Sequence, residues 1–192
     1  NNNDGSGELW DSDFVFADYG NEGNVFFPED FEDDLSAWDT TGMDSGDADS
    51  GIQTGSHPDL GISGPDEGTQ YLRLDSDDYV TRDLGDLSGE SDVVVKAAVA
   101  TGSMDNSSEN TKIQWYDGSA WTDLRTFYWE YNGQGWVEVG AVVPSSSLST
   151  DNRVRFRGYG GGGDHFAVDR VVVSDILHEH TTPAAPSGLS LD

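Results

Sequence analysis

A run of glycines near the end of the chain has the spacing of a nucleotide-binding motif. Residues 155–169 read RFRGYGGGGDHFAVD, so Gly158, Gly160 and Gly163 form the pattern G-x-G-x-x-G. In dinucleotide-binding proteins such glycines open a helix whose N-terminus holds the pyrophosphate. The residues that follow here include consecutive valines and show no helical stripe, so they predict a strand. The sequence therefore favours a turn between two neighbouring strands over a phosphate site.

Three arginines lie just before these glycines, on one face of an expected strand. Because side chains alternate along a strand, Arg153, Arg155 and Arg157 point one way while Val154 and Phe156 point the other. Guanidinium groups bind carboxylates and sulfates, which makes Arg155 a candidate contact for a uronic-acid or sulfated glycan. The alternative is a ladder of ion pairs with carboxylates on adjacent strands. The sequence leaves both interpretations open.

Aromatic residues that could stack on sugar rings gather in the second half of the chain. They lie in two expected hairpins, at Trp115, Trp121, Trp129, Tyr131 and Trp136. A β-sandwich core also needs aromatic side chains, so we expect most of these to pack inside. The residues expected on the surface are Trp121, Tyr128 and Trp136. Together with Arg155, these three are the candidate glycan-binding residues.

The first residues offer oxygen ligands in an order similar to that of a calcium-binding loop. The segment NNNDGSGELWD matches the third to twelfth positions of an EF-hand-like loop with Asn2, Asp4, Gly5, Ser6, Glu8 and Asp11. The first ligand would precede residue 1, and no helical pattern flanks the segment. A cation-binding turn is therefore an alternative to a solvated acidic segment.

Sequence motifs for catalysis are absent. The chain has no GxSxG, HExxH or Walker sequence. His178 and His180 stand in an HEH segment that lacks a scaffold and a further ligand. Cysteine is absent, which excludes disulfides and thiolate metal sites. We therefore expect a protein that is not an enzyme.

Short strands joined by tight turns form the expected framework. The strand-like runs are residues 70–74, 91–100, 111–116, 119–127, 153–157 and 166–174. Asp117-Gly118 and Asn132-Gly133 each lie between two such runs, which is typical of β-hairpins with positive φ at both central residues. Many short strands with such turns predict an all-β fold, either a β-sandwich or a barrel.

Acidic residues dominate the composition. In 192 residues, 37 Asp and Glu against 9 Lys and Arg give a formal net charge of −28. Such a surface repels itself unless salt or bound cations screen it, so we expect a halophilic protein or one that holds calcium. Nucleic acid is a poor partner because phosphate binding draws on clustered Lys and Arg. No apolar run approaches the roughly 20 residues of a membrane helix, so membrane insertion is not expected.

The ends of the chain differ from the middle. Residues 1–20 predict an acidic N-terminal arm or an extra strand, and residues 21–177 the sandwich itself. Residues 178–192 read HEHTTPAAPSGLSLD, which indicates a Pro/Ala linker. Its last part, PAAPSGLSLD, resembles the opening strand of a fibronectin type III domain, which implies a following module.

Five segments in order resemble a known family. They are FPEDFEDDLSAWDTTG, QYLRLDS, LGDLSGESDVVVKAAVA, IQWYDGSAWTDLRTF and VRFRGYGGGGDHFAVDRVVVSD. Over about residues 25–176 the chain resembles MAM-like, concanavalin-type jelly-roll modules of secreted bacterial and archaeal proteases, glycan-active enzymes and surface proteins. The strongest elements are the opening Phe-Glu followed by Trp38, and the closing D-x-V-x-V from Asp169 to Val173. The cysteines of animal MAM domains are missing, so their disulfide framework does not carry over.

The resemblance implies an all-β fold, a two-sheet antiparallel β-sandwich of the jelly-roll type without catalytic machinery of its own. It also implies a structural calcium ion. Related jelly rolls hold one between an acidic residue early in the fold and one in the last strand, here Glu32 and Asp169. Asp30, Asp33 and Asp164 are additional candidate ligands nearby in the sequence. Hard oxygen ligands fit calcium better than zinc. The alternative is that these acids are solvated surface residues.

These observations lead to two functional hypotheses. The first is a non-catalytic extracellular module that mediates adhesion or structural assembly of a cell-surface or secreted protein, stabilised by calcium or salt. Its partners would be other modules of the same chain or copies of itself, joined into a filament by strand addition to a sheet edge. The alternative is a carbohydrate-binding module that targets a secreted enzyme to polysaccharide. A row of exposed Trp and Tyr side chains would favour the alternative.

Overall fold

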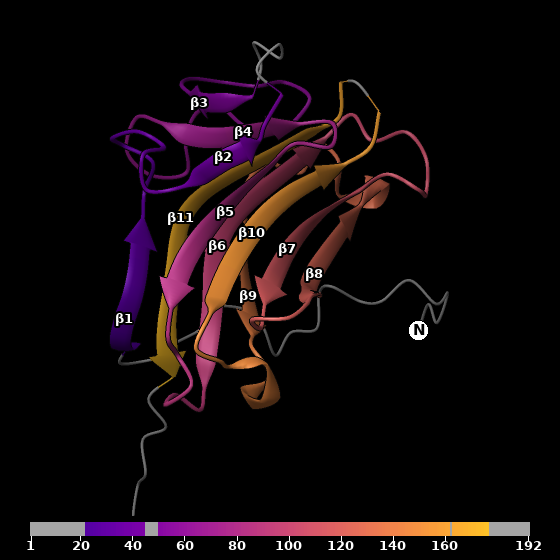
Figure 1. Cartoon of the computed structure of the whole chain (residues 1–192). Helices are drawn as coiled ribbons and strands as arrows, with labels where there is room; N and C mark the ends of the chain where they lie inside the picture. Colours follow the sequence, from indigo (N-terminus) through magenta and orange to yellow (C-terminus); the bar gives the residue numbers. More distant parts are fainter. Residues whose placement is uncertain (1–21, 45–49, 162, 177–192) are drawn as a thin grey trace, which may run out of the picture.

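The short strands predicted from the sequence pair into two antiparallel sheets that pack face to face (Figure 1). The computed structural model describes residues 22–44, 50–161 and 163–176. The predicted all-β jelly-roll sandwich is confirmed. The expected arm at 1–20 and the linker and fibronectin-like start at 178–192 lie outside the described residues and stay predictions.

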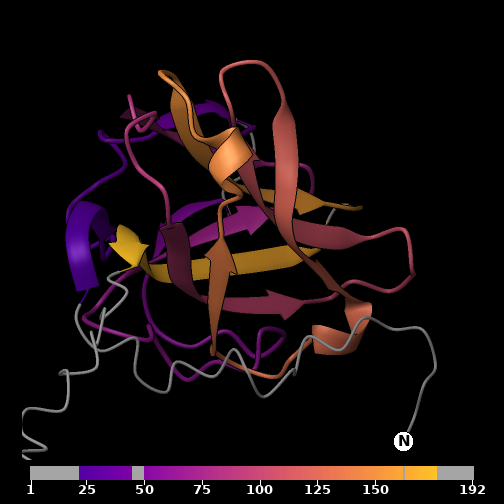
Figure 2. The same ribbon diagram turned by 90° about the horizontal axis from the view of Figure 1, so that it is seen from below.

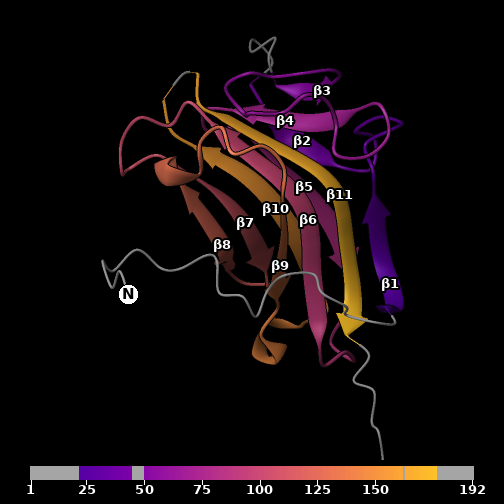
Figure 3. The same ribbon diagram turned by 180° about the vertical axis from the view of Figure 1, so that it is seen from behind.

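One sheet, called sheet A, is built around the long strand β11. Its order is β3-β4-β11-β6-β9, and β1 also pairs with β11. Figure 3 views the molecule from the side of this sheet. The strands of sheet A are Glu22–Glu29 (β1), Gly51–Gln53 (β3), Tyr71–Asp75 (β4), Val93–Gly102 (β6), Val137–Val142 (β9) and His165–Ile176 (β11).

The second sheet, called sheet B, has the order β2-β5-β10-β7-β8. Its strands are Asp39–Gly42 (β2), Tyr79–Gly85 (β5), Asn110–Tyr116 (β7), Trp121–Tyr128 (β8) and Asn152–Tyr159 (β10). Two single turns of 3-10 helix, Trp129–Tyr131 (η2) and Ser145–Ser147 (η3), lie between strands; the view from below in Figure 2 looks toward the end that carries η3. Within the described residues, no helix is long and apolar enough to span a membrane.

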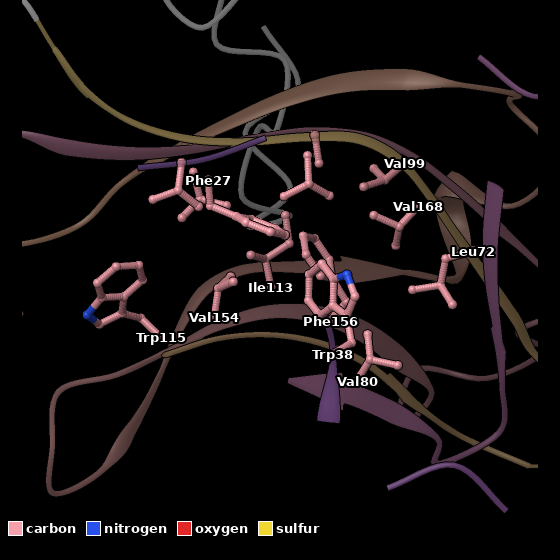
Figure 4. Close-up of a cluster of buried hydrophobic side chains, with 14 of the residues drawn as sticks. Phe27, Trp38, Leu72, Val80, Val99, Ile113, Trp115, Val154, Phe156 and Val168 are labelled. Atoms are coloured by element: carbon pink, nitrogen blue, oxygen red, sulfur yellow. The ribbon is translucent and has the colours of Figure 1, made fainter. Parts of the chain in front are cut away.

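The inner faces of the two sheets form the core. Alternate residues of the strands point between the sheets, where removal of apolar surface from water stabilises the fold. Trp115, Val154 and Phe156 of sheet B are fully buried there, as are Leu72 and Val168 of sheet A (Figure 4). The inner face of β10 therefore belongs to the core, and its arginines belong to the outer face.

The opening Phe-Glu motif is fixed by one carboxylate. Glu29 accepts a hydrogen bond from the backbone N–H of Phe31 (2.8 Å) and another from the indole N–H of Trp38 (2.9 Å). Phe31 has a φ of 57°, a conformation that costs energy for a residue with a side chain. Its ring stacks on that of Trp38, with centroids 5.8 Å apart. The carboxylate and the stacking together hold the strained residue in place.

One of the two predicted hairpins is confirmed and the other is wrong. Asp117-Gly118 joins the paired strands β7 and β8, although only Gly118 has a positive φ (88°), so the turn is not type I′. Asn132-Gly133 does not close a hairpin, because β8 and β9 lie in different sheets. The N–H of Gly133 donates instead to Thr101 at the end of β6. The chain uses this segment to cross from sheet B to sheet A.

The glycine run also crosses between the sheets. It joins β10 of sheet B to β11 of sheet A, so the prediction of neighbouring strands is wrong. A strand begins at His165 where a nucleotide site would need a helix, which agrees with the exclusion of nucleotide binding. A side chain at Gly160 would overlap the carboxylate of Asp164, so the crossing needs a glycine there.

Candidate functional site

The outer face of sheet B carries the arginine row that the sequence predicted. Val154 and Phe156 on β10 are fully buried, while Arg153, Arg155 and Arg157 point outward and are half-buried. The alternation of apolar residues and arginines along β10 therefore corresponds to side chains that point in turn into the core and toward an accessible face.

Strand register aligns the outward side chains in three rows across sheet B. In an antiparallel sheet, residues directly opposite each other place their Cβ atoms about 5 Å apart. The first row is Asp83, Arg153, Tyr116 and Trp121. The second is Asp39, Thr81, Arg155, Gln114 and Asp123. The third is Gly42, Tyr79, Arg157, Lys112 and Thr126.

Arg155 lies at the centre of this face, between two aromatic rings. Its guanidinium carbon is 3.8 Å from the ring centroid of Trp121 and 4.2 Å from that of Tyr79. Its Nε donates to the hydroxyl of Thr81 at 3.2 Å. Burial lowers the pKa of Arg155, but a guanidinium remains charged at physiological pH. The two rings and the hydrogen bond fix a positive charge in the middle of the sheet.

The flanking arginines differ in their partners. Arg153 pairs with Asp151, with Nε to Oδ1 at 3.1 Å, whereas Arg157 lies 5.0 Å from the ring centroid of Tyr159. In the described part of the chain, neither Arg155 nor Arg157 forms an ion pair with a carboxylate. The interpretation of the row as a ladder of ion pairs with adjacent strands therefore does not describe these two residues.

Two polar atoms on this face have no partner. The amide N–H of Gln114 donates to Asp123 Oδ1 (2.7 Å), which leaves the Oε1 of Gln114 buried without a hydrogen bond among the described residues. The Nε of Arg157 is likewise buried and unpaired there. Burial of Asp123 raises its pKa, but hydrogen bonds from Lys112 and Gln114 outweigh this effect and lower it. An acceptor and a donor thus remain free for water or for a ligand hydroxyl group.

Tyr79 is a site residue that the sequence analysis missed. Its ring lies over Gly42 of the neighbouring strand, where any side chain would overlap it. The alternation in YVTRD, with Tyr79 and Thr81 on the face opposite the buried Val80, is the signal that would have found it. Gln114 and Tyr116 were missed in the same way.

Two of the candidate glycan-binding residues lie elsewhere. Tyr128 is 41% exposed at the end of β8, next to the 3-10 turn. Trp136 packs over the outer face of sheet A, edge-to-face with Tyr71 at 5.6 Å, and its indole N–H donates to the carbonyl of Gly64 (2.8 Å). The structure therefore brings Trp121 and Arg155 together and leaves Tyr128 and Trp136 apart from them.

The carboxylate of Glu32, a candidate calcium ligand, holds backbone groups of a loop. Its Oε1 accepts the N–H groups of Thr69 (2.6 Å) and Gln70 (2.8 Å), and its Oε2 accepts the Thr69 hydroxyl (2.7 Å). These bonds, the Thr69 backbone bond first, lower the pKa of Glu32. Glu32 is thus ionised and anchors the loop after residue 68.

Asp169 holds the preceding part of the same loop. Its Oδ2 accepts the N–H groups of Asp66 (2.9 Å) and Glu67 (3.1 Å), and its Oδ1 accepts that of Arg170 (2.8 Å). The side chain is fully buried, and burial raises its pKa to about 6 against the effect of these bonds. The cation beside it is Arg170, which pairs with Asp66 and Glu138. Both resemblance-based calcium candidates therefore fasten one loop to the sandwich.

The remaining acidic candidates fall in two places. Asp30 and Asp33 line a groove of about 670 Å³ beside β1 and β11, together with Glu29, Glu67, Glu138 and Arg170. Asp164 lies five residues before Asp169 in an extended segment, about 16 Å away at the rise of a strand. Its burial, followed by the charge of Glu109, raises its pKa. Asp164 therefore does not join the other candidates, and the EF-hand-like loop and His178 and His180 lie outside the described residues.

Known structures share this fold. The CBM22-1 xylan-binding domain from Paenibacillus barcinonensis Xyn10C matches with a TM-score of 0.52 at 10% identity, covering 82% of this chain and 97% of that domain. The K3 cleaved adhesin domain of Lys-gingipain from Porphyromonas gingivalis w83 matches with a TM-score of 0.51 at 16% identity, covering 79% and 98%. TmCBM61 in complex with beta-1,4-galactotriose matches with a TM-score of 0.52 at 12% identity, covering 76% and 94%.

Sequence comparison adds no closer relative. No protein-family model and no curated protein matches the chain. At such low identities, the structural matches establish a jelly-roll β-sandwich of the kind found in carbohydrate-binding and adhesin modules, and the fold alone.

Proposed function

We propose that this chain is a non-catalytic carbohydrate-binding module of an extracellular protein, and that it binds polysaccharide on the outer face of sheet B. The observation that carries the proposal is the arrangement of Trp121, Arg155 and Tyr79 across three aligned strands. This reading replaces adhesion as the leading hypothesis, because the described aromatic residues do not all pack inside the core.

The chemistry of the face suits a sugar chain. Half-buried aromatic rings offer apolar surface to the C–H faces of pyranose rings, and the neighbouring polar side chains fix the hydroxyl groups. The unpaired Oε1 of Gln114 and Nε of Arg157 are buried, so a ligand would use them as acceptor and donor after their side chains have moved. A ligand that uses both removes two unsatisfied buried atoms, each of which costs about 1–3 kcal/mol when unpaired.

The charge of the face favours an acidic polysaccharide. Lys112, Arg153, Arg155 and Arg157 are four of the nine basic residues in a chain whose net charge is −28. All four project from neighbouring strands of sheet B onto its outer face. Arg155 and Arg157, which lack ion-pair partners in the described part, are free to bind the carboxylates of uronic acids.

Binding to polysaccharides in a gel or in a calorimeter tests this proposal. Glucuronoxylan and polygalacturonate serve as acidic ligands, and unsubstituted xylan and β-1,4-galactan as neutral ones. Trp121→Ala and Tyr79→Ala should each weaken binding tenfold or more, as expected for aromatic residues at the centre of a binding face. Trp129→Ala is the matched control, because Trp129 is 52% exposed and lies outside the three rows.

The outcomes separate the parts of the proposal. Loss of binding in Trp121→Ala with normal binding in Trp129→Ala supports the face as the site. Equal affinity for acidic and neutral ligands would contradict the proposed preference for acidic polysaccharides. It would still support the proposal that the chain is a carbohydrate-binding module. Absence of binding to all four polysaccharides, or equal effects of Trp129→Ala and Trp121→Ala, would overturn the site.

A structural calcium ion at the loop held by Glu32 and Asp169 remains part of the proposal. Asp30 and Asp33 line the adjoining groove, and carboxylate ligands in this number suit calcium. Calcium bound to the folded state alone would raise the melting temperature by several degrees. A chelator should reverse that increase in low salt. An unchanged melting curve with and without calcium would eliminate the ion.

Assembly through sheet edges is the second candidate function. Val142 on the edge strand β9 is 47% exposed, and Val25 on β1 is 43% exposed. Exposed apolar residues on edge strands favour pairing with another chain. If the edges join copies, sedimentation should show concentration-dependent oligomers, and Val142→Lys should abolish them. A monomer at all concentrations would leave carbohydrate binding as the only function proposed.

A further inference from the structure

A short loop over sheet A presents residues that the proposed function does not use. His57 and Ile62 exchange backbone hydrogen bonds at 3.0 and 3.2 Å, which closes a tight loop between them. Leu60, in the middle of the loop, is fully buried against sheet A, and its carbonyl accepts the N–H of Gly135 (3.0 Å). The backbone of the loop is therefore anchored at both its base and its tip.

The tip of this loop approaches the first residue of β11. His165 is paired with Gly102 in the sheet, and a side chain at Gly102 would overlap the carbonyl of Asp59. This close approach places the Asp59 carboxylate beside the His165 ring, with Oδ2 at 3.9 Å from Nε2. A glycine at the end of β6 thus brings two residues together that are far apart in the sequence.

His57 completes the group. Its ring lies edge-to-face with that of His165, with centroids 4.6 Å apart. The Nδ1 of His57 is buried and has no hydrogen-bond partner among the described residues.

The orientation of His165 is fixed from behind. Its Nδ1 lies 2.7 Å from Oδ1 of Asp75, a buried carboxylate that also contacts Arg73 at 3.2 Å. An imidazole held through one nitrogen by a carboxylate, with the other nitrogen facing outward, is the usual arrangement of a histidine that ligates a metal ion. The contact with Asp75 orients the ring so that Nε2 faces Asp59.

We propose that His57, Asp59 and His165 form a binding site for a divalent transition-metal ion such as zinc. One donor atom from each of the three lies within 4.8 Å of the others. In a tetrahedral zinc site these atoms would be about 3.3 Å apart, from zinc–ligand distances of about 2.0–2.1 Å. Asp59, whose side chain is 62% exposed, can rotate to make up the difference. A fourth position would remain for a water molecule.

Ligand chemistry selects the class of ion. Two imidazoles and one carboxylate suit zinc, copper, nickel or iron, whereas calcium and magnesium prefer oxygen ligands only. This site is distinct from the carboxylates of the calcium proposal and lies on the sheet opposite the carbohydrate face. The bound ion would fasten the loop of residues 57–62 to the start of β11, near β3 and β4 in Figure 1.

Zinc titration of the full chain by calorimetry, with cobalt absorption spectra as the structural readout, tests the site. The parent chain carries His178→Ala and His180→Ala so that the HEH segment cannot contribute. We expect one zinc ion per chain and a tetrahedral cobalt spectrum. Asp59→Asn should weaken zinc binding at least tenfold, and His57→Ala should weaken it further. Asp86→Asn is the control, since it removes the same charge from another exposed position that belongs to none of the proposed sites.

The variants give a clear decision. Asp59→Asn changes an exposed residue and should fold normally, which circular dichroism verifies. Loss of zinc binding in Asp59→Asn with full binding in Asp86→Asn supports the site. Unchanged affinity in both Asp59→Asn and His57→Ala would overturn it, as would loss of all binding in the parent that lacks His178 and His180.

Discussion

The outer faces of the two sheets are built differently. Every residue of β6 in sheet A is buried, whereas β10 in sheet B alternates between buried and half-exposed positions until its last residue. The sequences reflect this contrast, since VVVKAAVATG is apolar from Val93 to Ala100 except at Lys96, whereas NRVRFRGY alternates. A strand that is covered on both faces has a continuous run of apolar residues, whereas a strand with one open face alternates between apolar and polar residues.

The cover over sheet A is the segment that precedes β4. Leu60 and Ile62 pack on Tyr71, Ala100 and Ala167 in a second, smaller apolar cluster. The small side chains of Ala100 and Ala167 leave room for this segment, while Phe166 and Val168 on the same strand fill the main core. The two faces therefore have different roles: one supports structure and the other is free to bind a ligand.

The largest expected effect is loss of this cover. Leu60→Ala removes a fully buried side chain from the small cluster and should lower the free energy of unfolding by about 2–5 kcal/mol. Urea unfolding measures the change. Val142→Ala, at a position that is 47% exposed, is the control and should stay within about 0.5 kcal/mol of the parent. A cost below about 1 kcal/mol for Leu60→Ala would mean that the segment is not part of the folded unit.

The covered face should also make stability depend on pH. Burial raises the pKa of Asp169 to about 6 in the folded state, above the ordinary value of 3.8, so its protonated form is the one that folding favours. The contribution of Asp169 to the free energy of unfolding is therefore fully present below about pH 4. It decreases by about 3 kcal/mol as the pH rises to about 6. The difference in unfolding free energy between the parent and Asp169→Asn should fall by this amount between pH 4 and pH 7. A difference that does not vary with pH would contradict the burial of the ionised group.

A smaller effect is expected where β2 meets the open face. Gly42→Ala inserts a methyl group under the ring of Tyr79, which must move away from its position beside Arg155. Overpacking of this kind costs about 1–3 kcal/mol, and the ring at the surface can yield, so we expect about 1 kcal/mol. Polysaccharide affinity should fall by more than the decrease in the folded fraction that this loss of stability would cause. Normal affinity in Gly42→Ala would show that the position of the Tyr79 ring is not important for binding.

The smallest stability change is expected at the centre of the open face. Trp121→Ala should alter the free energy of unfolding by less than about 1 kcal/mol, because the ring lies outside both apolar clusters. Thermal unfolding checks this value beside the binding experiment. A loss comparable to that of Leu60→Ala would make Trp121 a structural residue and would weaken the contrast between the two faces.

Much of the fold could be predicted from local patterns. The alternation around Arg155 fixed which side of β10 is buried, and the runs at 91–100 and 111–116 became β6 and β7 with small shifts at their ends. The errors occurred where the chain changes sheet. Asn132-Gly133 and the glycines before Asp164 have the composition of hairpin turns, but nothing in a local pattern states whether the next strand joins the same sheet.

The candidate site was predicted only in part, for a similar reason. Trp121 and Arg155 were recognised from residue type, but their meeting with Tyr79 depends on the register of separate strands. Trp136 is a tryptophan like Trp121, but it packs against Tyr71 and covers sheet A. The histidine group was missed because His57 and His165 are more than a hundred residues apart in the sequence and meet only through the close approach at Gly102.

The contact between Gly42 and Tyr79 also has a consequence for evolution. Because a side chain at position 42 would displace the ring at position 79 from its place beside Arg155, the two positions are coupled. A relative that needs the ring in this place is expected to keep glycine at position 42, and one that has lost the ring is free to accept larger residues there. These two positions therefore offer a way to separate, among future homologous sequences, the chains that retain a binding face from those that preserve only the sandwich.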